Sequence, residues 1–241
     1  MRITELLKNK EQNRRNNKAV TIVFIGDSVT QGCFECYTKN DGSIETIFDY
    51  KSAYSTKVGD ILHMLYPSAQ VNIINSGISG DNAVGGNGRF ERDVLSYNPD
   101  LVVISFGLND CDAGKDGISK YTNALEEMFS ALKARNIEAV FLTENTMWTY
   151  ASVHLKEDKL VSLSEGFAEI QNSGLLKEYF VAAKNSCEKY GVKVCDLYNV
   201  WEAMEAAGVN TTELLANKLN HPTREMHYYI AMKIVEMFFS N

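Results

Sequence analysis

The chain has 241 residues, of which 45% are hydrophobic, and a net charge of −7 at pH 7. This length and apolar content suit one α/β domain with a sizeable core, and the acidic balance disfavours nucleic acid or an anionic membrane as the main partner. No apolar run approaches the roughly 18 residues of a membrane span, and charged residues interrupt the N-terminus before a signal-peptide core can form. We therefore expect a single domain over residues 1–241, a cytoplasmic location and no membrane span.

Residues 1–18 predict an N-terminal helical extension, with a solvated stretch from Lys8 to Lys18. Five short, β-branched apolar runs then predict buried strands, and longer stretches with helical spacing separate them. Strands that are apolar almost throughout and alternate with helices are typical of a doubly wound α/β fold, with a five-stranded parallel sheet in three α/β/α layers. We expect strands at Val20–Ile25, Gln70–Asn75, Leu101–Phe106, Ala139–Thr143 and Val192–Asp196, and helices at Ser52–Tyr66, Tyr121–Arg135, Leu175–Tyr190 and about Arg224–Phe239.

The cysteine count is five, an odd number, which together with the missing secretory signal favours free thiols. Cys33 and Cys36 form a C-x-x-C pair, which could be redox-active or half of a metal site. No second Cys or His pair has the spacing of a zinc site. We therefore expect neither a metal nor a cofactor.

Polar, glycine-containing turns follow the first three predicted strands, and they contain Ser28, Gly80 and Asn109. In an open parallel sheet, ligands bind beyond the carboxyl ends of the strands, so these turns should meet at one edge. A serine there can be a nucleophile if a base activates it. The backbone N–H groups of Ser28 and Gly80 and the side-chain amide of Asn109 can donate to an oxyanion.

The base is expected among the four histidines. His63 and His227 fall within helical apolar spacing and are predicted to be structural. His154 lies in a polar stretch after the fourth strand and could line a pocket or be surface. His221 precedes Pro222 on a stiff connection before the last helix, which makes it the predicted general base.

Four blocks of the chain resemble those of the SGNH, or GDSL-type, hydrolases. They are Gly26-Asp27-Ser28-Val29, Ser79-Gly80-Asp81, Gly107-Leu108-Asn109-Asp110 and His221-Pro222 with Ala231. The resemblance implies a flavodoxin-like sheet, Ser28 as nucleophile, His221 as base, and an oxyanion hole formed by Ser28, Gly80 and Asn109. Asp27 is expected to shape its turn rather than to act chemically.

One position departs from the family pattern, because Lys218 stands where an aspartate usually orients the histidine. A lysine cannot accept a hydrogen bond from an imidazole N–H. Three groups could take its place: a backbone carbonyl near Asn217 or Lys218, the Asn217 side chain, or a carboxylate such as Asp196 or Glu144. A Ser–His pair without the acid should still work, since the acid mainly orients and stabilises the imidazole.

The resemblance implies hydrolysis of short-chain acyl esters, including O-acetyl groups on a carbohydrate or small alcohol. The loops predicted to set specificity are Cys33–Lys51, Gly85–Arg89 and Glu144–Gly174, and the last holds Trp148, Tyr150 and His154, which could stack on a sugar or simply cover the core.

Two other classes of function stay open: a metal-dependent phosphoesterase using Asp27, Asp110 and His221, and a non-catalytic carbohydrate-binding relative. The α/β-hydrolase and dinucleotide-binding alternatives are weaker, because neither G-x-S-x-G nor G-x-G-x-x-G occurs at the required place.

Overall fold

The computed structural model describes residues 1–240, so Asn241, the last residue of the predicted domain, lies outside the described residues. Its centre is a five-stranded parallel sheet with strand order β4-β1-β5-β6-β7, as the sequence predicts. After β1 the chain adds β4 on one side of it and then β5, β6 and β7 on the other side. In a doubly wound sheet, ligands bind at such a switch point, which here lies between β1 and β5. The strands are β1 (Val20–Gly26), β4 (Val71–Gly77), β5 (Leu101–Ser105), β6 (Glu138–Thr143) and β7 (Lys193–Asp196).

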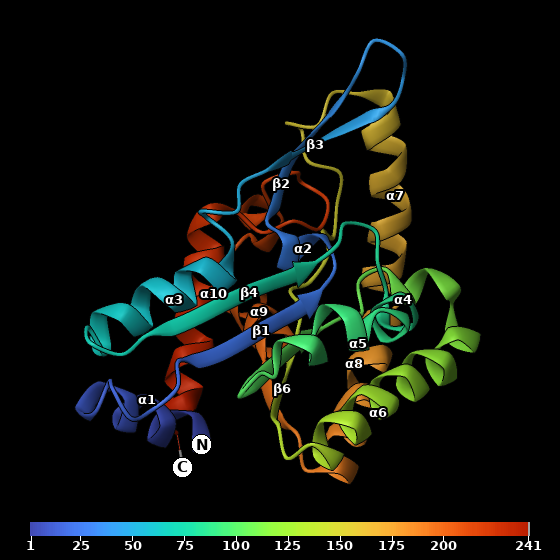
Figure 1. The fold of residues 1–241 in the computed structure, drawn as a ribbon. Helices are drawn as coiled ribbons and strands as arrows, with labels where there is room; N and C mark the ends of the chain where they lie inside the picture. The colour runs from blue at the N-terminus through green and yellow to red at the C-terminus, as the bar shows by residue number, and fades with distance from the viewer. Residues whose placement is uncertain (241) are drawn as a thin grey trace.

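Helices cover both faces of this sheet (Figure 1). On one face lie α1 (Arg2–Gln12), α3 (Tyr54–Leu65) and α10 (Arg224–Phe239), and on the other lie α4 (Ala83–Gly88), α5 (Phe90–Asp93), α6 (Ile118–Ala134) and α8 (Leu175–Tyr190). The remaining helices are α2 (Ser28–Gln31), α7 (Asp158–Asn172) and α9 (Leu197–Ala206), with 3-10 turns at Leu95–Tyr97, Asp110–Ala113, Lys115–Gly117 and Thr211–Leu214.

Burial explains why the sheet takes this form. All seven residues of β1 and all five of β5 are buried, so these two strands must be covered on both faces. One cluster of buried apolar side chains extends from α1 through the sheet to α10. The predicted N-terminal helix is therefore more than a solvated extension: it begins at Arg2, and Ile3 and Leu7 are fully buried in this cluster.

Two predicted loops contain regular structure. In the region 33–51, β2 (Cys33–Thr38) and β3 (Ile44–Phe48) pair as an antiparallel hairpin. The region 144–174 contains α7, which lies beside the hairpin beyond the carboxyl end of the sheet (Figure 1). The backbone N–H of Thr38 donates to the Glu157 carboxylate at 2.5 Å and joins the two. The third predicted loop, Gly85–Arg89, is mostly the end of α4.

None of the helices within residues 1–240 is both long and apolar enough to cross a membrane. All five cysteines are free thiols, as the odd count predicts, so the Cys33–Cys36 pair is not joined by a disulfide.

Candidate active site

Ser28 is the first residue of α2 and follows β1 with only Asp27 between them. The Asp27 carboxylate accepts a hydrogen bond from Val29 N–H at 2.9 Å and so caps this short helix. Because the first N–H groups of a helix have no intrahelical acceptor, the Ser28 N–H is free to bind an external one. The Ser28 side chain is only 4% exposed, which keeps its hydroxyl at a fixed place beside the sheet edge.

His221 faces Ser28 across the site: its Nε2 lies 3.0 Å from the Ser28 Oγ. Its Nδ1 lies 3.0 Å from the backbone carbonyl oxygen of Phe34. A carbonyl oxygen can only accept, so Nδ1 carries the ring proton and Nε2 presents its lone pair to the serine hydroxyl. This is the tautomer that a general base needs.

The carbonyl of Phe34 therefore occupies the place expected for a triad acid. The sequence-based alternatives for this place are wrong in detail: a backbone carbonyl holds the imidazole, but it comes from β2 and not from Asn217 or Lys218. Asp196 caps α9 through Asn199 N–H and pairs with Lys184, and Glu144 binds Leu108 N–H. Neither carboxylate contacts His221.

Phe34 itself is firmly held, which makes its carbonyl a fixed acceptor. It is fully buried, and its ring packs against the imidazole of His227 with 4.7 Å between centroids. The Arg224 guanidinium lies over the same ring at 4.3 Å and also pairs with Asp49 at 3.0 Å. His227 is thus a packing residue, as its helical position predicts, and it contacts the residue that orients His221.

The loop before His221 is organised by the side chain of Asn217. Its Oδ1 accepts hydrogen bonds from three successive backbone N–H groups, those of Leu219, Asn220 and His221, at 2.9–3.0 Å. Lys218 adopts a left-handed conformation with φ 57° and pairs with Glu213 at 2.8 Å. Asn217 therefore supports the histidine through its backbone and does not touch its ring nitrogens.

Gly80 lies in a turn in which Asp81 N–H donates to the Ile78 carbonyl at 3.1 Å. Its φ of 79° is in the region that favours glycine. Within residues 1–240 no acceptor is hydrogen-bonded to the Gly80 N–H, and a Cβ placed here would meet no heavy atom within 4 Å. The turn thus offers a backbone N–H without an acceptor at a residue that has open space on its Cβ side.

The Asn109 side chain reaches the same turn. Its Nδ2 donates to the Asp81 carbonyl at 2.7 Å and makes a longer contact of 3.3 Å with the Asp27 carboxylate. One amide hydrogen is therefore firmly used, while the second is weakly used and can be redirected. Ser28, Gly80 and Asn109 come from three strand ends, and these contacts bring their turns together.

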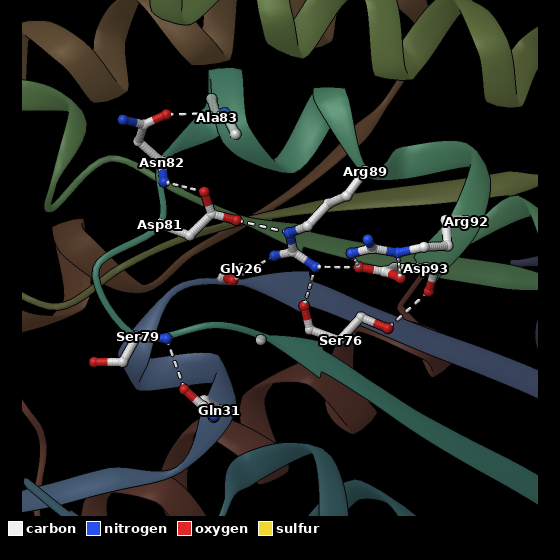
Figure 2. A network of polar contacts seen from close by, with 12 residues as sticks. Gly26, Gln31, Ser76, Ser79, Asp81, Asn82, Ala83, Arg89, Arg92 and Asp93 are labelled. Atoms are coloured by element: carbon white, nitrogen blue, oxygen red, sulfur yellow. Dashed lines mark hydrogen bonds and ion pairs between the residues drawn. The ribbon is translucent and has the colours of Figure 1, made fainter.

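Arg89, a residue that the sequence analysis did not single out, joins two of these turns (Figure 2). Its guanidinium pairs with Asp81 at 2.7 Å and donates to the carbonyls of Ser76 at 2.7 Å and Gly26 at 3.2 Å. The Gln31 side chain also accepts from Ser79 N–H at 2.6 Å (Figure 2). A planar five-donor group suits such a junction, but no local sequence pattern reveals which arginine will lie there.

The comparison with known families decides what kind of site this is. The model of the GDSL-like lipase/acylhydrolase family matches residues 24–228, a range that contains Ser28, Gly80, Asn109 and His221. The chain belongs to this family.

Individual relatives of this GDSL-family chain are distant. An acetylxylan esterase of Geobacillus stearothermophilus is 34% identical over 89 residues, which cover 37% of this chain and 39% of that protein. A type II NADH:quinone oxidoreductase of Staphylococcus epidermidis is 26% identical over 157 residues, covering 64% and 38%. The matches thus span less than half the length of these curated relatives.

In three dimensions, a two-domain esterase active on acetylated mannans superposes with a TM-score of 0.66 at 18% identity, over 98% of this chain and 51% of that one. This likeness establishes the fold that the GDSL family shares.

The two side chains predicted to line the substrate site differ in exposure. Trp148 is fully buried and its indole N–H donates to the Ser164 carbonyl at 2.7 Å, so of the two roles left open for it, stacking on a sugar or covering the core, its burial supports the second. His154 is exposed and lines a pocket of about 260 Å³ together with Cys36, Tyr37 and Lys218. Tyr37 comes from the hairpin, which the sequence analysis treated as a loop.

In this GDSL-family fold, His221 and Asp110, two of the ligands of the alternative metal site, are hydrogen-bonded to other protein groups. Both ring nitrogens of His221 face protein groups, and Asp110 accepts from Ala83 N–H at 3.0 Å. Within residues 1–240 no group of three or more His, Cys, Asp and Glu side chains is arranged to hold a metal ion. The geometry favours the serine mechanism over the phosphoesterase alternative.

Proposed function

We propose that this protein is a serine esterase that removes short acyl groups, chiefly acetyl, from hydroxyl groups of carbohydrates. The observation that carries the proposal is the 3.0 Å contact between Ser28 Oγ and the Nε2 of a correctly oriented His221. Membership of the GDSL family supports ester hydrolysis. The relatives that act on acetylated xylan and mannan support a carbohydrate substrate.

The proposed reaction has two steps. In the first, Ser28 Oγ attacks the ester carbonyl carbon while His221 Nε2 takes its proton, and the oxyanion binds the N–H groups of Ser28 and Gly80 and the Asn109 amide. The tetrahedral intermediate expels the alcohol, which receives the proton from His221, and leaves an acyl-Ser28. In the second, water attacks this ester with His221 again as base, and the acid and free serine are released.

The neutral carbonyl of Phe34 can replace a carboxylate in this scheme because it enforces the same tautomer. It does not supply the negative charge that stabilises an imidazolium. The pKa of His221 is accordingly lowered to about 4, chiefly by burial, with only partial compensation from the Phe34 hydrogen bond. His221 is therefore an unprotonated, weak base at neutral pH.

This lowered pKa predicts an unusual acid limit for activity. A base works only when unprotonated, so kcat/KM should stay constant from pH 7 to about pH 5 and fall as the pH approaches the His221 pKa of about 4. The check is a pH profile of p-nitrophenyl acetate hydrolysis. A midpoint at 6.5 or above would contradict it, and a midpoint near 6 that disappears in Asp27→Asn would assign the limit to Asp27, whose pKa burial raises to about 6.

The function itself is tested by comparing the turnover of p-nitrophenyl acetate, butyrate and octanoate, and of acetylated xylo- and manno-oligosaccharides, with and without EDTA. We expect acetyl esters to be hydrolysed fastest, acetate to be released from at least one oligosaccharide, and EDTA to have no effect. Binding of the oligosaccharides without turnover of any ester would instead support the carbohydrate-binding alternative, and loss of activity with EDTA would support the metal-dependent one.

A further inference from the structure

Glu144 follows β6 and lies between the turns that carry Ser28 and Asn109. Its side chain is only 1% exposed. Its Oε2 accepts from the Leu108 N–H at 2.9 Å, and its Oε1 is buried without a hydrogen-bond partner among residues 1–240. Among charged groups, the neighbouring Asp27 carboxylate acts most strongly on the pKa of Glu144. Leu108 immediately precedes Asn109, and Asp27 caps the helix that begins at Ser28. Glu144 is thus joined by a hydrogen bond to the turn of Asn109 and neighbours the turn of Ser28 through Asp27.

Two neighbouring carboxyl groups that are both buried favour sharing one proton, because two like charges side by side in a buried place repel each other. The partners indicate which group holds it. Both oxygens of Asp27 face N–H donors, those of Val29 at 2.9 Å and Asn109 at 3.3 Å, which favours the charged form. The Oε1 of Glu144 has no such donor within residues 1–240. The proton therefore belongs on Glu144.

The surroundings favour the same assignment. The pKa of Glu144 is raised well above its ordinary range, first by burial and then by the charge of Asp27. The titratable groups that are coupled to Glu144 by charge are carboxyl, phenol and thiol groups, and none of them is a cation that would stabilise a second charge. They are Asp27, Asp110, Tyr54, Tyr121 and Cys111.

We propose that Glu144 is a positioning residue that acts as a neutral carboxylic acid: its hydroxyl donates to Asp27, its carbonyl oxygen accepts from Leu108 N–H, and the two bonds fix the nucleophile turn against the oxyanion turn. The proposal rests on the esterase function proposed above. It also explains how the site tolerates Glu144 so close to a developing oxyanion, since a neutral acid adds no repulsive charge.

The segment after Glu144 extends this support to the histidine. The side-chain amide of Asn145 donates to the Asn220 carbonyl at 2.9 Å, and the backbone N–H of Trp148 donates to the Leu219 carbonyl at 3.0 Å. The same stretch of backbone therefore holds the loop of His221. Glu144 is the member of this stretch that binds Leu108 and neighbours Asp27, the residues that precede Asn109 and Ser28.

Two substitutions separate a neutral acid from an ionised one. Glu144→Gln keeps one donor and one acceptor at the same places, whereas Glu144→Leu removes both. We expect Glu144→Leu to lower kcat for p-nitrophenyl acetate about 10- to 100-fold with little change in KM, because a small misplacement of the reacting groups has an effect of this size. Glu144→Gln should recover most of this loss.

Asp100→Leu is the matched control, because Asp100 is a buried carboxylate that accepts from Thr21 N–H at 3.0 Å at the other end of β1. It should lower the melting temperature without lowering kcat.

Infrared spectroscopy gives a readout that does not depend on activity. The wild type at pH 7 should show a protonated carboxylic acid band that is missing from Glu144→Gln, and this holds even if no ester is turned over and the proposed function fails. Absence of that difference band would overturn the proposal. So would a kcat loss in Glu144→Gln as large as that in Glu144→Leu, or a folded Glu144→Leu enzyme with unchanged kcat.

Discussion

Ser28→Ala should lower kcat for p-nitrophenyl acetate by at least about 10³-fold, and His221→Ala should have an effect of the same order. The reason is that Ser28 Oγ and His221 Nε2, 3.0 Å apart, act in one proton transfer, so either group is ineffective without the other. For the same reason, the double variant should be hardly slower than either single one. Steady-state kinetics of the three variants measure this.

The control for these variants is a second buried histidine, His227. His227→Gln removes a fully buried imidazole that contacts Phe34 without facing Ser28, so it should lower stability while lowering kcat far less than His221→Ala does. If Ser28→Ala matched the wild type, the nucleophile assignment would fail. Additive losses in the double variant would show that the two residues do not act together.

The sheet could be predicted from the sequence because its signal is local. β1 and β5 are buried over their full lengths, so most of their residues are apolar and many are β-branched, and their bounds were predicted to within one residue. Polar turns directly after such strands gave the positions of Ser28, Gly80 and Asn109. Once the strand order places these ends side by side, the turns meet without further information.

The hairpin was missed although a signal was present. Asp41-Gly42 between two runs of strand-forming residues is typical of a tight hairpin turn, and Gly42 indeed has φ 79°. The helix α7 was missed because its burial is slight: Leu160, Ser164 and Gln171 are its only buried residues. A helix with so narrow a buried face has a weak periodic pattern.

The group that orients His221 could not have been found by any motif. Every residue has a backbone carbonyl, so the acceptor at Phe34 has no signature in side-chain chemistry. It is set by the hairpin that brings β2 toward the final loop, over a separation of 187 residues. Lys218 signalled that the usual aspartate was missing, but only the tertiary structure shows what replaces it.

Asn109→Ala should lower kcat by about 10²- to 10³-fold, the usual effect of losing one oxyanion donor, with KM for p-nitrophenyl acetate changed little. The argument rests on the two hydrogens of the Asn109 amide. One holds the Asp81 carbonyl at 2.7 Å, and the other makes only the long 3.3 Å contact with Asp27, so a developing oxyanion can take it at low cost. An interaction that forms mainly in the transition state appears in kcat and leaves ground-state binding nearly unchanged.

Asn109→Asp distinguishes this role from simple support of the turn. It keeps the size of the side chain but replaces the donor by a charged acceptor beside Asp27, so it should be at least as inactive as Asn109→Ala. Asn72→Ala is the matched control, since the Asn72 amide donates to Thr21 Oγ1 at 3.2 Å, far from the carboxyl end of the sheet. If Asn109→Ala raised KM while leaving kcat intact, Asn109 would bind the substrate in its ground state, and the oxyanion hole would consist of backbone N–H groups alone.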